Sequence, residues 1–142
     1  MNEQNYKNHS RYTIQWHFVT GGAVIAVLGG SIVNLINSSK ENLYSASLLV
    51  AVAFILISIF WYSRQFALRA QDRAIRAEEN FRHYLLTGKP LDNRISMGQI
   101  IALRFAADEE FPLLVQKAIA ENLKSNEIKK IIVNWRSDHH RA

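Results

Sequence analysis

Two long stretches of this chain contain no Asp, Glu, Lys or Arg: residues 12–39 and residues 42–63. Only Lys40 and Glu41 separate them. A bilayer core of about 30 Å needs roughly 20 mostly apolar residues in a helix, and each stretch is long enough. The sequence therefore predicts an all-α protein built on a two-helix transmembrane hairpin, with spans at about 14–37 and 43–63.

A signal peptide is the main alternative for the first apolar stretch, because the stretch lies near the N-terminus. The apolar part of a signal peptide has about 7–15 residues, and this stretch is about twice as long. No clear small-x-small cleavage site precedes the second stretch. We therefore expect the first stretch to be retained as a membrane span.

The distribution of basic residues predicts the orientation of the hairpin. Arg64, Arg69, Arg73 and Arg76 follow the second span, and Lys7 precedes the first. Basic residues that flank spans tend to remain in the cytoplasm, so both termini are expected there. The four arginines are candidates for binding anionic lipid headgroups or an acidic partner. Because topology explains these arginines, the net charge of +5 does not predict a nucleic-acid partner.

The region after the hairpin begins as one long helix. No Gly or Pro occurs in it before Gly88 and Pro90, so a continuous helix is expected from about Leu43 to Leu86. The chain then has four predicted parts: a polar lead (1–11), the transmembrane hairpin (12–63), a cytoplasmic helical stalk (64–88) and a cytoplasmic helical module (89–142).

Three short amphipathic segments predict that the module is a small bundle of three helices. Ser96 and Gln99 have the spacing of a capping box for the first helix, and Pro112 is tolerated in the first turn of the second. Ser125 can cap the third helix. The apolar residues of this third helix follow helical spacing: Ile128, Ile131, Ile132 and Trp135.

Small residues recur at helical spacing in the first span and predict close helix packing. The members of this small-residue stripe are four residues apart: Gly22, Ala26, Gly30 and Asn34. The partner is left open between the second span of the same chain, near Ala46 and Ala53, and a helix of another chain.

A second packing face is predicted on the stalk, where six residues alternate at spacings of three and four. They are Ala67, Ala70, Ala74, Ala77, Phe81 and Tyr84, and we call them the alanine face. This spacing is typical of the seam of a helix pair. We therefore expect a homo-oligomer or a larger membrane complex in contact with lipids.

The sequence gives no signal for catalysis, a cofactor or a metal site. It has no cysteine, no G-x-S-x-G and no H-E-x-x-H motif, which are common signatures of nucleophilic and zinc enzymes. A non-enzymatic interaction or accessory subunit is the interpretation that we favour. The alternative is a small membrane enzyme or transport component that acts on a lipid-like ligand through His17, Arg64 and Arg69.

Several segments resemble a family of small bacterial membrane proteins with two spans. They are QNYKNHSR at 4–11, QDRAIRAEEN at 71–80, IALRFAADEEFP at 101–112, EIKK at 127–130 and NWR at 134–136. The family is classed as a domain of unknown function. The resemblance implies a protein of the bacterial inner membrane and supplies no activity or catalytic residue.

Overall fold

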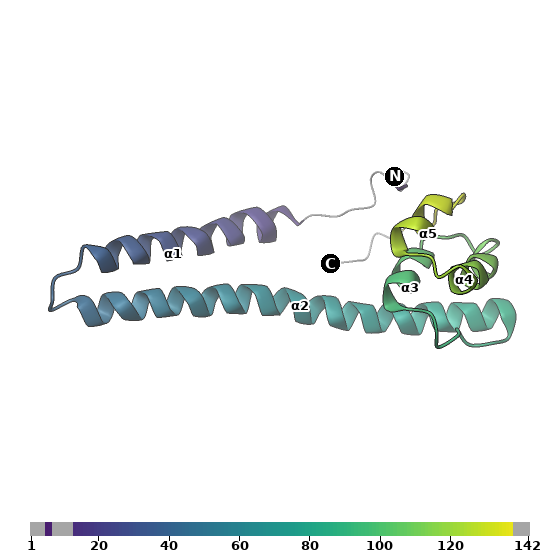
Figure 1. Cartoon of the computed structure of the whole chain (residues 1–142), viewed down its shortest axis with the longest axis horizontal. Coiled ribbons are helices and arrows are strands. Elements are labelled where there is room, and N and C mark those ends of the chain that lie inside the picture. The colour runs from purple at the N-terminus through teal and green to yellow at the C-terminus, as the bar shows by residue number, and fades with distance from the viewer. Residues whose placement is uncertain (1–4, 7–12, 138–142) are drawn as a thin grey trace. The chain divides into compact units, whose positions relative to one another are not determined.

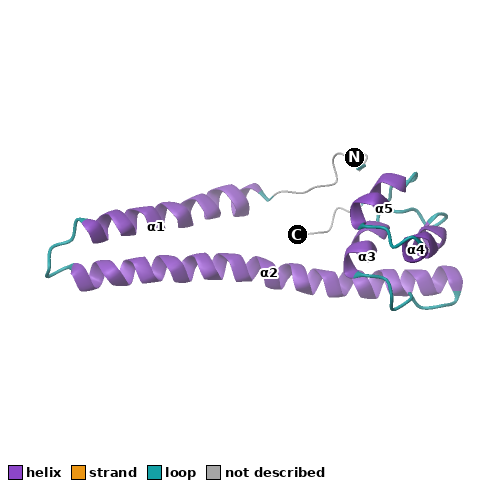
Figure 2. Cartoon of the chain, viewed as in Figure 1, coloured by secondary structure: helices purple, strands orange, loops and turns teal. Residues whose placement is uncertain are grey.

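The computed structural model describes residues 5–6 and 13–137, so the predicted polar lead lies largely outside the described residues. Over the described ranges the fold is all-α, with five α-helices and no strand (Figures 1 and 2). This confirms the predicted fold class. The helices are α1 (Gly21–Ile36), α2 (Leu43–Thr87), α3 (Met97–Leu103), α4 (Phe111–Ala120) and α5 (Ser125–Ile131).

Helix α2 is continuous over 45 residues, as the absence of internal Gly and Pro predicts. It ends at Thr87, where Gly88 adopts a φ of 72°. This left-handed conformation terminates helices and favours glycine because it has no Cβ. Thr87 Oγ1 also donates a hydrogen bond of 2.7 Å to the carbonyl oxygen of His83 in the last turn.

The chain divides into two compact units, and α2 contributes to both. One unit contains the described residues between 13 and 67, and the other contains residues 68–137 together with 5 and 6.

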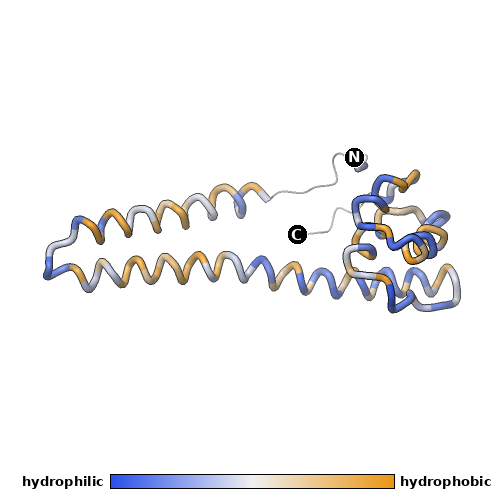
Figure 3. The backbone as a smooth tube through the Cα atoms, in the orientation of Figure 1, coloured by the Kyte–Doolittle hydropathy of each residue, from blue (hydrophilic) through white to orange (hydrophobic). Residues whose placement is uncertain are grey.

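The first unit consists of two apolar helical segments. A π-helical turn, η1 (Gln15–Thr20), leads directly into α1, so the first segment covers Gln15–Ile36. The second is the N-terminal part of α2, and both are predominantly hydrophobic in Figure 3. Only 6% and 11% of their most apolar 18-residue windows are buried. Both helices are therefore long and apolar enough to cross a membrane, and most of their apolar side chains are uncovered.

Within this unit, a few small and aromatic residues make the contacts between the two segments. The rings of Trp16 and Phe60 stack with centroids 4.6 Å apart. A Cβ atom added at Gly21 would lie 3.5 Å from the Phe60 ring. Ala46 and Ala53 are buried, as is Ser31 of α1.

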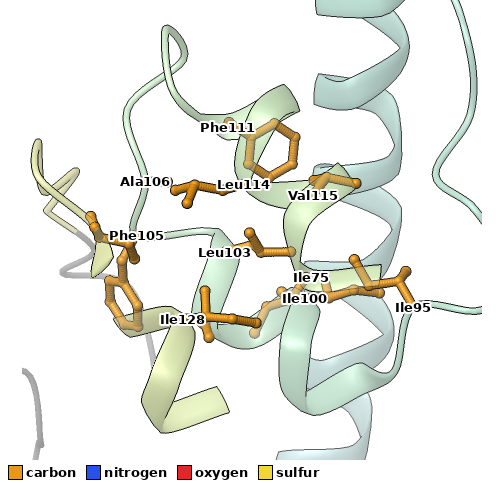
Figure 4. Packing of buried hydrophobic residues seen from close by; sticks show 13 residues of the cluster. Ile75, Ile95, Ile100, Leu103, Phe105, Ala106, Phe111, Leu114, Val115 and Ile128 are labelled. Carbon is orange, nitrogen blue, oxygen red and sulfur yellow. The ribbon is translucent and has the colours of Figure 1, made fainter. Parts of the chain in front are cut away.

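The second unit has a hydrophobic core to which α2, α3, α4 and α5 all contribute. Figure 4 shows Ile75 of α2 beside Ile100 of α3, with Phe111 and Leu114 of α4 on the same core. Ile128 of α5 is fully buried. Because α2 supplies a core residue, residues after Thr87 do not form this core alone.

The capping box predicted for α3 is present. The Gln99 N–H donates to Ser96 Oγ at 3.3 Å, and the Ser96 N–H donates to Gln99 Oε1 at 2.8 Å. The Gln99 amide nitrogen also donates to the carbonyl oxygens of Ala118 and Leu123, at 3.2 and 3.0 Å. The residue that caps α3 therefore also ties this helix to the end of α4.

The prediction for the last helix is wrong at both ends. The N-cap is Lys124, and Ser125 is the first helical residue; the Lys124 N–H donates to Glu127 Oε2 at 2.6 Å. Helix α5 ends at Ile131, before Trp135. The following segment is extended, and the Arg136 N–H donates to the Phe105 carbonyl oxygen at 2.7 Å. Pairing with the segment after α3 replaces the helical hydrogen bonds that the apolar spacing predicted.

Candidate functional site

The second unit has a groove of about 1340 Å³ between α2, the loop at 88–94 and α4. We call it the basic groove. Helix α2 contributes Arg73, Arg76, Ala77, Asn80, His83 and Thr87; the loop contributes Lys89, Pro90, Leu91, Asp92, Asn93 and Arg94; and α4 contributes Val115, Gln116, Ile119 and Ala120.

The helical repeat places the polar residues of α2 along one wall of the groove. Arg73, Arg76, Asn80 and His83 are spaced by three or four residues and therefore share one side of the helix. The buried side of α2 lies next to this wall and includes Ile75, which is 5% exposed. The same helix thus supplies both a core residue and the cationic wall.

The loop at 88–94 is fixed to α2 by side-chain hydrogen bonds. The Leu91 N–H donates to Asn80 Oδ1 at 2.8 Å. Because the Lys89 carbonyl oxygen can only accept, His83 Nδ1 donates to it across 2.8 Å. The Lys89 N–H donates to Thr87 Oγ1 at 3.2 Å. These contacts hold the backbone around Lys89 against the end of α2 and bring this lysine to the groove.

The groove carries an excess of positive charge. Four of its lining residues are Lys or Arg and one is Asp, which leaves three positive charges uncompensated within the lining. Arg94 pairs with Asp92 at 2.6 Å. Arg73 and Arg76 are exposed and form no ion pair with any residue that the structure describes. Their guanidinium groups are available to an anion from outside the chain.

The pair of Asp92 and Arg94 fixes the charge of the only carboxylate in the lining. Hydrogen bonds from the Arg94 side chain and backbone lower the pKa of Asp92 from 3.8 to about 2. The ionised form is favoured, so Asp92 stays negative at any pH above this value. The groove therefore keeps the same carboxylate charge across the physiological range.

Replacing Arg94 with Gln should raise the pKa of Asp92 from about 2 towards 3.8, because the charged hydrogen-bond donor is lost. Since the folded pKa is depressed, the stability that this pair contributes is present above pH 3.8 and lost as the pH falls towards 2. Carboxyl chemical shifts of Asp92 during an NMR pH titration measure the change. An unaltered midpoint in Arg94→Gln would contradict this account.

An ion cluster around Arg82 joins α2 to the start of α4. Arg82 donates to Glu79 Oε2 at 3.0 Å, to Asp108 Oδ1 at 2.6 Å and to the Ala106 carbonyl oxygen at 2.7 Å. Its guanidinium also lies 4.2 Å from the centroid of the Phe111 ring. Each nitrogen of the Arg82 guanidinium thus has a partner within the chain, in contrast to Arg73 and Arg76, and these contacts indicate a structural role.

The structure brings together only part of the predicted arginine group. Arg73 and Arg76 line the basic groove, whereas Arg69 is exposed outside the lining and Arg64 is half-buried in the first unit. His17, named for the enzymatic alternative, belongs to the first unit, where its Nδ1 lies 2.9 Å from the Thr13 carbonyl oxygen. These residues therefore do not form a single described site.

The small-residue stripe of α1 is exposed at all four positions, Gly22, Ala26, Gly30 and Asn34. A Cβ atom added at Gly22 or Gly30 would meet nothing within 4 Å. The less exposed side of α1 is a different one and consists of Gly21, Val24, Leu28 and Ser31. The stripe therefore does not pack on the second span in the described residues, and its partner stays a prediction.

The alanine face of α2 is also uncovered. Ala67, Ala70, Ala74 and Ala77 are all exposed, and the Phe81 and Tyr84 side chains are 62% and 53% exposed. No described residue of the chain buries this face, and its partner stays a prediction.

The loop residues of the groove, Lys89 and Arg94, were not among the predicted site residues. These residues follow the end of α2, where no helical period relates them to Arg73 or Arg76. The only hint in the sequence was the helical spacing of Asn80, His83 and Thr87, three polar residues near the end of α2 that can form hydrogen bonds with a following loop.

One family model, described as a family of unknown function (DUF6526), matches residues 1–142. No curated protein and no solved structure matches the chain.

Proposed function

Since this chain belongs to DUF6526, a family of unknown function, over its whole length, we propose a function from its geometry: it is a membrane-anchored interaction subunit. In this proposal α1 and the N-terminal part of α2 form a transmembrane hairpin. The second unit is a non-enzymatic cytoplasmic module that binds an acidic partner at the basic groove.

The observation that carries the proposal is the contrast between the two units. In the first, the apolar side chains of two long helices are mostly uncovered, which is unfavourable in water and favourable in lipid. In the second, apolar residues are gathered in a core and the groove arginines are exposed. This distribution of exposed apolar and exposed charged side chains is expected of a lipid-embedded anchor joined to a water-exposed domain.

The orientation follows from charge. The arginines of α2 begin at Arg64, directly after the apolar segment, and basic flanks favour the cytoplasmic side. A hairpin then places both termini in the cytoplasm. The resemblance to bacterial two-span proteins supports the inner membrane as the location.

The partner is expected to carry carboxylates, because the groove offers planar guanidinium groups that can each bind a carboxylate through two hydrogen bonds. Val115 and Ile119 of α4 add apolar surface to the lining. An acidic protein segment with interspersed apolar side chains fits this combination of charges and apolar surface.

The proposal predicts that reversing the groove charge abolishes partner recovery. Arg76→Glu with Lys89→Glu, two cations of the groove lining, should reduce the amount of partner crosslinked in native membranes at least tenfold, because the anionic partner then meets like charge. Mass spectrometry of the crosslinked complexes measures the recovery.

A matched control reverses two exposed lysines outside the groove, Lys117→Glu with Lys130→Glu. This variant has the same change in net charge and should retain the partner. Equal recovery with both variants would show that the groove is not the binding site. An equal loss of partner recovery with both variants would show that the effect depends on net charge and not on the groove.

A further inference from the structure

Helix α2 presents three different sides in the second unit. Ile75 and Glu79 are buried against the module, and Arg73 and Arg76 line the basic groove. The alanine face occupies the third side, borders the groove at Ala77, and is exposed along its length. The chain's own described residues therefore account for two sides of the helix and leave the third uncovered.

We infer that a second copy of this chain covers the alanine face, and that two α2 helices pair in a parallel coiled coil. The inference rests on the proposed function, because two copies inserted in one membrane with the same orientation present their α2 helices in parallel. In such a pair each member of the face meets its own counterpart, so the same surface serves both copies.

The charges beside the face support a second copy as the occupant. Arg73 immediately precedes the seam residue Ala74, and Glu78 immediately follows the seam residue Ala77. In a parallel coiled coil, a residue in the position of Arg73 lies beside the residue five positions later in the partner helix. Arg73 of one copy therefore lies beside Glu78 of the other, and twofold symmetry forms this ion pair twice.

The side chains of the face suit close packing followed by aromatic contact. Alanines allow helix axes to approach to about 8 Å, the lower end of the usual 8–10 Å range. Phe81 and Tyr84, exposed at 62% and 53%, then bury their rings against the second copy. This burial supplies apolar stabilisation that alanines alone provide weakly.

Membrane insertion compensates for the short length of the seam. From Ala70 to Tyr84 the seam covers about two heptads, fewer than the three or four that make a coiled-coil pattern distinctive in a sequence. Two copies confined to one bilayer have a high effective concentration. A modest intrinsic affinity is then sufficient for pairing.

Cysteine crosslinking tests the inference directly, because the natural chain has no cysteine. Ala70→Cys and Ala74→Cys should each form disulfide-linked dimers in native membranes under mild oxidation. The adjacent variant Arg69→Cys, which lies off the face, should form at least tenfold less dimer. Non-reducing gel electrophoresis measures the dimer, and mass spectrometry identifies its two chains.

Three results would overturn the inference. Equal crosslinking of Ala70→Cys and Arg69→Cys would show random collision. Crosslinks that form only between Ala70→Cys and Tyr84→Cys in a mixed sample would show an antiparallel pair. A disulfide adduct with another protein as the main product at Ala74→Cys would identify a different occupant.

Charge exchange provides a second measurement. With Ala74→Cys as the reporter, Arg73→Glu and Glu78→Arg should each lower the dimer yield severalfold, and the two together should restore it. Failure of the double variant to restore the yield would overturn the predicted register.

Alkaline carbonate extraction of the same membranes separates this inference from the proposed function. Protein that stays in the membrane but forms no seam-specific dimer overturns only the pairing. Protein that is extracted and forms no dimer overturns both the anchor and the pairing.

Discussion

Replacing Arg82 with Ala should lower the free energy of unfolding of the second unit by about 3–5 kcal/mol, the range found when one partner of a buried ion pair is removed. The side chain of Arg82 is 10% exposed, and that of Glu79 is 9% exposed. Without the guanidinium, the Glu79 carboxylate loses its ion-pair partner in a site that water barely reaches. The Ala106 carbonyl oxygen also loses its hydrogen bond from Arg82.

Two matched variants separate burial from charge. Arg76→Ala removes an exposed arginine of the same helix and should change stability by no more than about 0.5 kcal/mol. Asp108→Asn alters the other ion pair of Arg82, but the Asp108 side chain is 60% exposed. Water can therefore solvate the polar groups that formed this pair, and the free energy of unfolding should fall by about 0–1 kcal/mol.

Amide hydrogen exchange of α3, α4 and α5 measures these changes, since it reports the local opening free energy of these helices without unfolding the first unit. A similar loss of protection in Arg82→Ala and Arg76→Ala would show that the ion cluster does not hold α2 to the module.

Replacing Leu114 with Ala should lower the free energy of unfolding of the second unit by about 2–5 kcal/mol. Leu114 lies in the core with 9% exposure, so truncation removes buried apolar surface and leaves a cavity. Ala is also the best helix former, and the loss therefore reflects packing and not helix propensity.

The neighbouring residue provides a control with an identical chemical change. Leu113 belongs to the same helix but is 69% exposed, so Leu113→Ala should change stability by no more than about 0.5 kcal/mol. The same hydrogen-exchange measurement compares the two. Similar losses in both variants would mean that α4 buries a different face from the one shown in Figure 4.

The extent of α2 could be predicted from the sequence because a helix without internal Gly or Pro has no local reason to end. Gly88 then supplies a local reason, and its φ of 72° shows that the chain uses it. The capping box at Ser96 and Gln99 was equally local. Such features depend on a few adjacent residues, and a single sequence contains all the information that they need.

The partners of each face of α2 could not be predicted in this way. Glu79 and Arg82 look like ordinary surface charges in the sequence, yet their side chains are only 9% and 10% exposed. Arg82 also contacts Asp108 and Phe111, which come later in the chain. The groove depends on the same return of the chain, since Lys89 reaches it only after Gly88 reverses the direction of the backbone. Nonlocal contacts of this kind leave no periodic pattern in the sequence.

The contribution of Ile75 to the core has a consequence for the order of biosynthesis. Ile75 precedes all other core residues, which run from Ile95 to Ile132. When the ribosome has produced the end of α2, the apolar surface around Ile75 still lacks the residues that will cover it. The core that contains Ile75 therefore cannot be completed until the chain up to Ile132 has been translated, so α2 is synthesised before the unit to which its C-terminal part belongs can fold.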